Sequence, residues 1–535
     1  MLQTILQDNA ITPVRQNPQR RKYTRVAFEE SVRVRLTGGK RQGFTARDLS
    51  LGGLSFYCDE PLPVNGHKIE VSFQPPRRFI DDVFDSKCRL TAGIINKRSD
   101  NYGSKEYVAV QFDKDLGTIA KGVYKSRILK TSFLIPVIVL LILFLKKLNL
   151  EYYWYHPLMN LYSLTVTAYL LSRFLIAFFY SPPAAIGYSP AVSIVIPVKN
   201  DERIIGRAIE QCFLSNYPKD KLEVIVVNDG STDKTMEEIE RSKLRYPELA
   251  VIDFKINKGK RQAMAEGARA ARGEILVYID SDSLIGRDSL KHIVQGFSQP
   301  KVGAVSGHAN VLNGDENLLA RMQEVRYYLA FRVLKAAEHL FSAVSCCSGT
   351  LSAYRKSYLM EILDKWLNQK FLGAPATLGD DRSLTNFILR KYRVLYDCRA
   401  AVETVVPVTW KEFFKQQLRW KKSWFRESII ASGFIWRKHP VASISFYAAV
   451  LLPLISPLIV FNTFICRPLF FGQPPTHYLF GFCLMSLLYS FYYLLKRPNS
   501  KWIYGIYFCI VYMAVLSWQT YYAALTCRRN HWGTR

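Results

Sequence analysis

Five long apolar runs constrain the fold of this chain most, because a helix of about 20 apolar residues can cross a bilayer. They occupy residues 131–145 (extended by 128–129), 157–180, 441–466, 478–495 and 502–525. A buried core helix is the alternative for the first two runs, since the first is short and the second contains Arg173. An aromatic turn, Tyr152–Tyr155, joins these two, so we expect a hairpin that returns the chain to its starting side.

The last apolar run is flanked by Lys496–Arg497 and by Arg528–Arg529. Positive residues favour the cytosolic side of a membrane, and one full crossing cannot satisfy both ends. Either this run re-enters the membrane, or it breaks near Trp518–Gln519 and returns along the interface, which is the arrangement that we expect.

The composition favours a membrane protein that handles anionic ligands. Lys and Arg number 72 against 44 Asp and Glu, which gives a formal net charge of +28, and aromatic residues make up 13% of the chain. No zinc-finger or RNA-binding signature supports nucleic acid as the partner. The ten cysteines show no C-x-x-C spacing and fit reduced cytosolic thiols. The first residues lack the pattern of a cleaved signal peptide, which we therefore do not expect.

Residues 20–127, after a tail at 1–19, read as a small β domain with strands at 32–36, 54–57 and 107–112. Arg21 and Arg25 precede it, and Asp48, Ser50 and Gly53 follow in the order D-x-S-x-x-G. These two motifs resemble those of the PilZ domain. The resemblance implies a cyclic di-GMP sensor in which arginine forks grip the phosphates. A solvated basic linker and an ordinary Asp-Ser turn are the alternative.

Residues 191–436 alternate short apolar strands with helices, which predicts a parallel sheet with crossover helices. Strands are expected at 192–197, 222–227, 250–252 and 273–278. Acidic and cationic residues follow these strands and should converge on one edge of the sheet. The candidate donor-binding residues there are Asp201, Asp229, Lys258, Lys260, Asp280 and Asp282.

This edge has the chemistry to bind a nucleotide diphosphate. Asp201 and Asp229 can accept hydrogen bonds from a base and a ribose, and Lys258 and Lys260 can meet phosphates. Asp282, with Asp280 near it, would hold Mg²⁺ or Mn²⁺ bridging the diphosphate.

The order of P-V-x-N-D-E, V-N-D-G-S-T-D, N-K-G-K-R and D-S-D resembles a GT-A glycosyltransferase of family 2. Ser348–Arg355 resembles the acceptor-side loop of hyaluronan and chitin synthases, Gly379–Arg382 their G-D-D-R segment, and Gln416–Trp420 the Q-x-x-R-W signature of processive synthases. The resemblance implies a processive family 2 synthase of the hyaluronan, chitin and cellulose type. Trp532–Arg535 resembles the W-G-T-(R/S) end of hyaluronan-type synthases, which in that family lies near the nucleotide on the cytosolic face; a frayed terminus is the alternative.

The resemblance also implies roles on the acceptor side. Asp381 would be the general base of an inverting transfer, with Asp380 as its rival, and Arg419 would neutralise the leaving diphosphate. The acceptor-binding candidates are Gln416, Trp420, Cys346, Ser348 and Gly349. Trp420 offers a flat face for a sugar ring, although a core aromatic is the alternative, and Cys346 can equally be a buried structural thiol.

We therefore expect a multidomain membrane protein: a PilZ β-barrel at 20–127, two membrane helices at 128–180, a GT-A domain with interfacial helices at 191–436 and a membrane region at 437–535. It would polymerise a β-linked polysaccharide from a nucleotide-sugar donor, a UDP-sugar, under cyclic di-GMP control. We expect it in the bacterial inner membrane, with both globular domains cytoplasmic and periplasmic or outer-membrane export partners. A GDP-mannuronate-using alginate synthase and a non-catalytic cyclic di-GMP scaffold are the alternatives.

Overall fold

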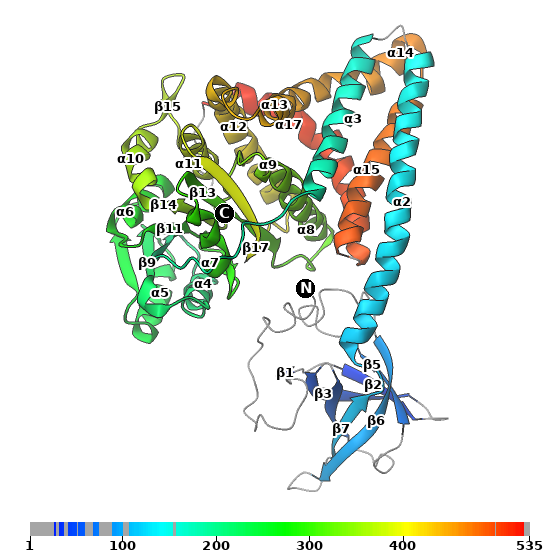
Figure 1. Ribbon diagram of the computed structural model, residues 1–535, viewed down its shortest axis with the longest axis vertical. Coiled ribbons are helices and arrows are strands. Elements are labelled where there is room, and N and C mark those ends of the chain that lie inside the picture. The colour runs from blue at the N-terminus through cyan, green and yellow to red at the C-terminus, as the bar shows by residue number, and fades with distance from the viewer. Residues whose placement is uncertain are drawn as a thin grey trace. The chain divides into compact units, whose positions relative to one another are not determined.

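A computed structural model describes residues 26–27, 31–36, 41–50, 52–58, 68–73, 88–99, 106–152, 157–497 and 499–528. The chain forms two compact units, one of Met1–Leu140 with Leu488–Ile503 and the other of Leu141–Leu487 with Tyr504–Arg535. The elements of each unit are shown in Figure 1.

A closed antiparallel barrel forms the N-terminal part of the first unit. Its strands are β1 (Val26–Ala27), β2 (Ser31–Leu36), β3 (Arg41–Ser50), β4 (Gly53–Cys58), β5 (Lys68–Phe73), β6 (Cys88–Ser99) and β7 (Glu106–Phe112). The order is β1-β3-β2-β5-β6-β7-β4, and a further β3–β4 pairing closes the barrel, as the sequence predicted. The core is apolar and centred on Phe56, Val71 and Val110, each of them fully buried.

In the part of the chain that the structure describes, five helices are long and apolar enough to cross a membrane: Ile128–Glu151, Pro157–Phe178, Pro440–Phe471, Thr476–Lys496 and Ser500–Leu525. The first belongs to α2 (Leu116–Tyr152), so the domain boundary expected at residue 127 falls inside one helix. The second is α3 (Pro157–Phe178), the third begins with α13 (Pro440–Phe461) and includes α14 (Arg467–Phe471), and the fourth is α15 (Thr476–Lys496). Each of these helices contains a window of 18 residues with a high mean hydropathy, so all five apolar runs are long enough to form membrane-crossing helices.

The break expected at Trp518–Gln519 is wrong, because the backbone there is helical. The last run consists of η7 (Ser500–Ile503), α16 (Tyr504–Val511), the π-type segment η8 (Tyr512–Leu516) and α17 (Ser517–Leu525). A π-type segment adds a residue to the helix and keeps its backbone groups paired, which a lipid-facing chain requires.

The second unit is built on a mixed sheet of eight strands in the order β10-β9-β8-β11-β14-β13-β17-β12. They are β8 (Val192–Val198), β9 (Leu222–Asp229), β10 (Ala250–Phe254), β11 (Ile275–Tyr278), β12 (Ser283–Ile285), β13 (Val302–Val311), β14 (Ser352–Arg355) and β17 (Arg393–Thr404). The strands from β10 to β11 are parallel, as predicted. The sheet as a whole is not parallel, because β14 runs antiparallel to both β11 and β13 and β12 runs antiparallel to β17.

The helices of this unit pack on the sheet or connect it to the membrane helices. They are α4 (Ile205–Phe213), α5 (Thr235–Arg245), α6 (Lys260–Ala270), α7 (Ser289–Ile293), α8 (Leu318–Leu329), the π-type η5 (Ala330–Lys335), α9 (Ala336–His339), α10 (Lys356–Leu367), α11 (Asp380–Leu389) and α12 (Trp410–Ile435). The basic and aromatic helix expected at residues 411–427 is confirmed as the N-terminal part of α12, which packs against α17.

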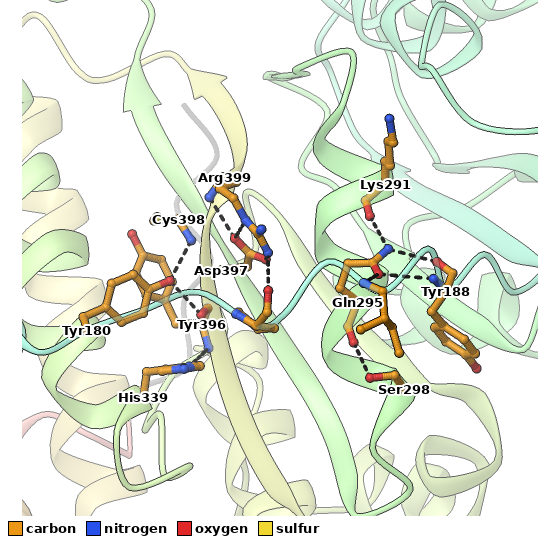
Figure 2. A network of polar contacts seen from close by, with 12 residues as sticks. Tyr180, Tyr188, Lys291, Gln295, Ser298, His339, Tyr396, Asp397, Cys398 and Arg399 are labelled. Atoms are coloured by element: carbon orange, nitrogen blue, oxygen red, sulfur yellow. Dashed lines mark hydrogen bonds and ion pairs between the residues drawn. The ribbon is translucent and has the colours of Figure 1, made fainter. Parts of the chain in front are cut away.

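A strap of residues 179–191 joins α3 to the first strand of the sheet, and hydrogen bonds fasten its whole length (Figure 2). The Tyr180 hydroxyl donates to the carbonyl of Tyr396 and accepts from the amide of Cys398, both at 3.0 Å. The guanidinium of Arg399 donates to the carbonyl of Pro183 at 2.6 Å. These contacts attach the start of the strap to β17.

One glutamine side chain holds the second half of the strap. The Gln295 carbonyl accepts from the amides of Ile186 and Tyr188, and its amide donates to the carbonyl of Tyr188 at 2.9 Å (Figure 2). Because Gln295 is buried, these bonds are sheltered from competing water.

Candidate active site

The carboxyl ends of parallel strands bring acidic residues to one edge of the sheet. Asp201 follows β8, Asp229 ends β9, and Asp280 follows β11. The hydroxyl of Ser281 donates to a carboxylate oxygen of Asp201, so the loops after β8 and β11 are in contact. This is the edge at which open α/β sheets bind their ligands.

Asp229 holds the loop that contains the candidate phosphate-binding lysines. Its carboxylate, 4% exposed, accepts from the amide of Lys258 at 2.7 Å and from that of Gly259 at 3.1 Å. Burial raises the pKa of Asp229, although these two amides oppose the change. Gly230, at φ 64°, lets the loop approach, since a Cβ there would lie 2.6 Å from the nitrogen of Asn257. The carboxylate expected to meet a base or ribose is therefore engaged with protein amides.

The two candidate lysines differ in their surroundings. The ammonium of Lys258 lies 4.4 Å from the centre of the Phe254 ring. That of Lys260 donates to a carboxylate oxygen of Asp280. Burial would lower the pKa of Lys260, but the charge and hydrogen bond of Asp280 outweigh it and the pKa is raised. Lys260 therefore carries its positive charge at the edge of the sheet.

The second aspartate of the D-S-D motif has other partners. The hydroxyls of Ser283 and Thr404 donate to Oδ1 of Asp282 at 3.3 and 3.4 Å. Among the described residues, no group of three or more His, Cys, Asp or Glu side chains could hold a metal ion. Asp280 and Asp282 fit a hard divalent cation that takes its other oxygen ligands from phosphates and water.

Asp380 and Asp381 begin α11, directly after Gly379 in the left-handed conformation at φ 70°. A Cβ on Gly379 would lie 1.5 Å from the hydroxyl oxygen of Ser423, so only glycine lets this turn pack on α12. Asp380 forms a buried ion pair with Arg261, whose Nε lies 2.6 Å from Oδ1. Burial raises the pKa of Asp380, with Asp381 adding to the rise and Arg261 and Lys260 opposing it.

A short segment, Cys346–Gly349, lies beside one aspartate of each pair, Asp381 and Asp280. The Cys346 thiol lies 3.5 Å from Oδ2 of Asp381, and burial, with the charge of Asp381, raises the thiol pKa to about 12. At the other end, a Cβ on Gly349 would lie 3.1 Å from both carboxylate oxygens of Asp280. The loop expected to bind the acceptor is thus next to the residues expected to bind the donor and the metal.

Sequence reasoning missed Lys335, which ends the π-type segment η5. Its ammonium donates to the hydroxyls of Ser306 and Ser348 at 2.9 and 2.8 Å. Burial lowers its pKa, while neighbouring acidic groups oppose the change. No clear signal for it exists in the sequence, because the stretch Ala330–Lys335 also contains Arg332; the π-type backbone, which often lies at functional sites, is seen only in the fold.

The Q-x-x-R-W residues lie on the N-terminal half of α12. Gln416 presents a buried carbonyl oxygen that has no hydrogen-bond partner among the described residues. Buried polar atoms in natural proteins are rarely left without a protein, ligand or water partner. Trp420 is 37% exposed, with Tyr327 and the guanidinium of Arg326 beside its ring. Arg419 precedes it on the same helix.

In the barrel, the D-x-S-x-x-G residues shape one tight turn between β3 and β4. The Ser50 hydroxyl donates to the carbonyl of Gly53 at 3.1 Å, and a Cβ on Gly53 would lie 2.3 Å from the carbonyl oxygen of Val110. A bulge in β3 at Arg47 places Arg47 and Asp48 outside the core. Arg21, Arg25 and the tail Trp532–Arg535 lie outside the described residues.

Arg47 is a second residue that sequence reasoning missed. Its guanidinium donates to the Tyr57 hydroxyl at 2.9 Å and lies 5.6 and 5.5 Å from the ring centres of Tyr57 and Tyr107. A cation on an aromatic pair beside Asp48 makes a flat, polar surface on the barrel.

Family models match both globular parts of the chain. The model described as Glycosyl transferase family 2 matches residues 193–363, and that of the PilZ domain matches residues 19–124. The fold, the convergent aspartates and these matches define a membrane-bound glycosyltransferase with a PilZ domain.

Similar proteins identify the family of the chain more closely. Hyaluronan synthase of Streptococcus pyogenes is 30% identical over 421 residues, which cover 76% of this chain and 98% of that protein. An N-acetylglucosaminyltransferase of Rhizobium meliloti (strain 1021) is 34% identical over 283 residues, covering 51% and 66% of the two chains. The structure of mannosyltransferase PcManGT from Pyrobaculum calidifontis, in complex with GDP-Man and Mn2+, is 22% identical with a TM-score of 0.48 and covers 67% of this chain and 99% of that one. The chain belongs to the processive family 2 glycosyltransferases, the family of hyaluronan synthase.

Proposed function

We propose that this protein polymerises a β-linked polysaccharide from a UDP-sugar, passes the polymer through its own membrane helices and responds to cyclic di-GMP. The single observation that carries the site assignment is the Cys346–Gly349 segment. It contacts Asp381 at one end and Asp280 at the other, so one short loop would face both the acceptor and the donor.

The reaction needs a base on the acceptor and positive charge on the donor. The acceptor hydroxyl oxygen attacks the anomeric carbon, its proton passes to the Asp381 carboxylate, and the bond from that carbon to the diphosphate oxygen breaks. The electron pair leaves with the diphosphate. Lys260 and Arg419 would stabilise the charge that develops there.

A divalent cation fits this scheme and would be held by Asp280 and Asp282. When bound, it would supply positive charge to the diphosphate. Lys260 pairs with Asp280, so its positive charge would lie next to both the cation and the phosphates.

Residues of α12 would hold the acceptor end of the polymer. The unpartnered carbonyl oxygen of Gln416 can accept from a sugar hydroxyl, and the exposed face of Trp420 can stack on a sugar ring. Asp380 makes a poorer base than Asp381, because Arg261 already engages its carboxylate.

The proposed placement is the bacterial inner membrane with both globular parts in the cytoplasm. The α2–α3 hairpin would return the chain to one side, and Lys496 and Arg497 follow the positive-inside tendency. Cyclic di-GMP would be bound by Asp48 and Ser50 together with Arg21 and Arg25. Export partners beyond this membrane belong to the same proposal.

The function is tested with the full chain in detergent or nanodiscs, offered radiolabelled UDP-sugars singly and in pairs, and GDP-mannuronate, with Mg²⁺ or Mn²⁺. Polymer from a UDP-sugar supports the proposal, and polymer from GDP-mannuronate alone overturns its donor. Binding of cyclic di-GMP without turnover of any donor would identify a scaffold.

A further inference from the structure

A network of buried hydrogen bonds begins at Arg261, the residue after Lys260 on α6. Arg261 is 8% exposed and its partner Asp380 is 5% exposed. Besides the bond from its Nε to Asp380, its Nη1 donates to the carbonyl of Trp366 and to Oε1 of Gln369, both at 3.1 Å. The guanidinium also lies 5.2 Å from the Trp366 ring centre. One side chain therefore fixes α6, the end of α10 and the start of α11 together.

The network of hydrogen bonds continues to α12, the helix that carries the Q-x-x-R-W residues. Gln369 donates from Nε2 to Oε1 of Glu427 at 3.1 Å, and the Ser383 hydroxyl donates to Oε1 of Gln369. Glu427, on α12, is fully buried and pairs with Arg426 at 2.9 Å. Asn386 of α11 donates to the carboxylate of Glu427 at 3.0 Å. The same network thus connects α6 through α11 to α12.

Lys260 and Arg261 lie side by side in sequence but serve different aspartates. Lys260 pairs with Asp280 on the donor side, and Arg261 pairs with Asp380, the neighbour of Asp381. α10 packs against both α6, which carries Lys260 and Arg261, and α11, which carries Asp380 (Figure 1).

We propose that Arg261 is a positioning residue that sets Asp381 against the acceptor. The inference rests on the proposed function, since it concerns the same transfer. Arg261 acts through Asp380, whose place at the start of α11 fixes the direction of the next side chain.

The chemistry requires arginine at this position. Its planar fork serves acceptors in three directions, on Asp380, Trp366 and Gln369, whereas a lysine presents a single ammonium. The network also balances charge, with Arg261 and Arg426 against Asp380 and Glu427. Removing one of them leaves an uncompensated buried charge.

The experiment compares R261K, R261Q, D380N and the double variant R261Q/D380N with the wild type in the full chain. Polymerisation gives kcat and donor KM, and thermal unfolding in detergent gives stability. R269Q is the matched control, because Arg269 lies on the same helix, also pairs with carboxylates (Glu266 and Asp364) and is exposed.

We expect R261K and R261Q to lower kcat by about tenfold to a hundredfold with little change in donor KM, since a small misplacement of a catalytic group costs that much. The double variant should be no slower than the slower single variant, because both substitutions interrupt one path. R269Q should match the wild type.

A pH profile separates positioning from a merely structural role. The charged groups that face Asp380 are Arg261, Lys260 and Asp381. Loss of Arg261 removes a cation that lowers the pKa of Asp380, so the acid side of the kcat profile should shift to higher pH in R261Q. It should not shift in R261Q/D380N, which lacks that carboxyl group.

Additive losses in the double variant, or an R261K enzyme with wild-type kcat, overturn the inference. If R261Q does not fold, the kcat of R261K alone tests the inference, because R261K keeps the positive charge that the buried Asp380 requires. A wild-type protein that turns over no donor overturns the proposed function, whereas an active wild type with unaffected Arg261 variants overturns only this inference.

Discussion

The Cys346 thiol lies 3.5 Å from Oδ2 of Asp381, so the acceptor-side loop and the candidate base meet at a defined point. Asp381→Asn keeps the shape of the side chain but cannot accept the acceptor proton. We expect kcat to fall by about 10²- to 10⁴-fold, the usual contribution of a general base, with donor KM nearly unchanged. Initial rates of polymer formation measure this, and D381N activity within threefold of the wild type would contradict it.

The reactivity of Cys346 follows from its environment. Burial and the charge of Asp381 raise its thiol pKa to about 12, so almost no thiolate is present at neutral pH. We expect iodoacetamide to modify Cys346 much more slowly than free glutathione at pH 7.5, as peptide mass spectrometry would show. Labelling should increase with pH. Equal rates at Cys346 and glutathione would show that Cys346 is not held against the carboxylate.

Gly230→Ala should displace the loop that Asp229 holds. The added Cβ would lie 2.6 Å from the backbone nitrogen of Asn257, at a φ of 64°. We expect donor KM to rise about tenfold, because Lys258 and Lys260 follow directly, while a strained left-handed alanine alone costs about 1 kcal/mol. Gly373→Ala is the control, since Gly373 has φ 79° and nothing within 4 Å of an added Cβ. Equal effects in both variants would assign the loss to backbone strain.

Gln416→Met should separate stability from function. It removes a buried carbonyl oxygen that has no partner, so thermal stability should stay the same or rise, by about 1 kcal/mol. Polymer length should fall, because a hydrogen bond to the acceptor sugar is lost. Gel analysis of the product and a thermal melt measure the two effects. Full-length polymer from Q416M would remove Gln416 from the acceptor site.

Arg47→Ala should weaken binding of cyclic di-GMP to the full chain by at least about fivefold, because a charge-assisted contact beside Asp48 is lost. Lys68→Ala is the control, since Lys68 is also an exposed cation of the barrel and pairs with Asp113. Calorimetric titration compares the two. Equal affinities would show that the Arg47–Tyr57–Tyr107 surface takes no part in nucleotide binding.

Local patterns predicted the elements well, and long-range contacts explain what they did not predict. Apolar runs and strand-end carboxylates are short-range signals, so the five helices, the strands β8 to β11 and the positions of Asp229 and Asp280 follow from the sequence. The antiparallel strand β14 was not expected, because its pairing with β11 joins residues about 80 apart in sequence.

Contacts between residues far apart in the sequence also explain what the sequence did not predict about the site. Arg261 ends the N-K-G-K-R motif, and its partner Asp380 lies 119 residues away. Asp229 was expected as a donor-binding residue, and the backbone amides of Lys258 and Gly259, which bind its carboxylate, come from the next loop. The sequence shows which residues are charged, but only the fold shows which residue each of them pairs with.

Hydrogen bonds fix the strap between α3 and β8 at several points along its length. Tyr180, Pro183 and Tyr188 are fastened in turn to β17 and to Gln295, so the chain between the last residue of α3 and the first strand cannot lengthen or shorten. Any tilt of this membrane helix, whether from a passing polymer or from a thicker bilayer, would be transmitted as strain to the sheet. Lipid composition would then act on the catalytic rate without touching a substrate.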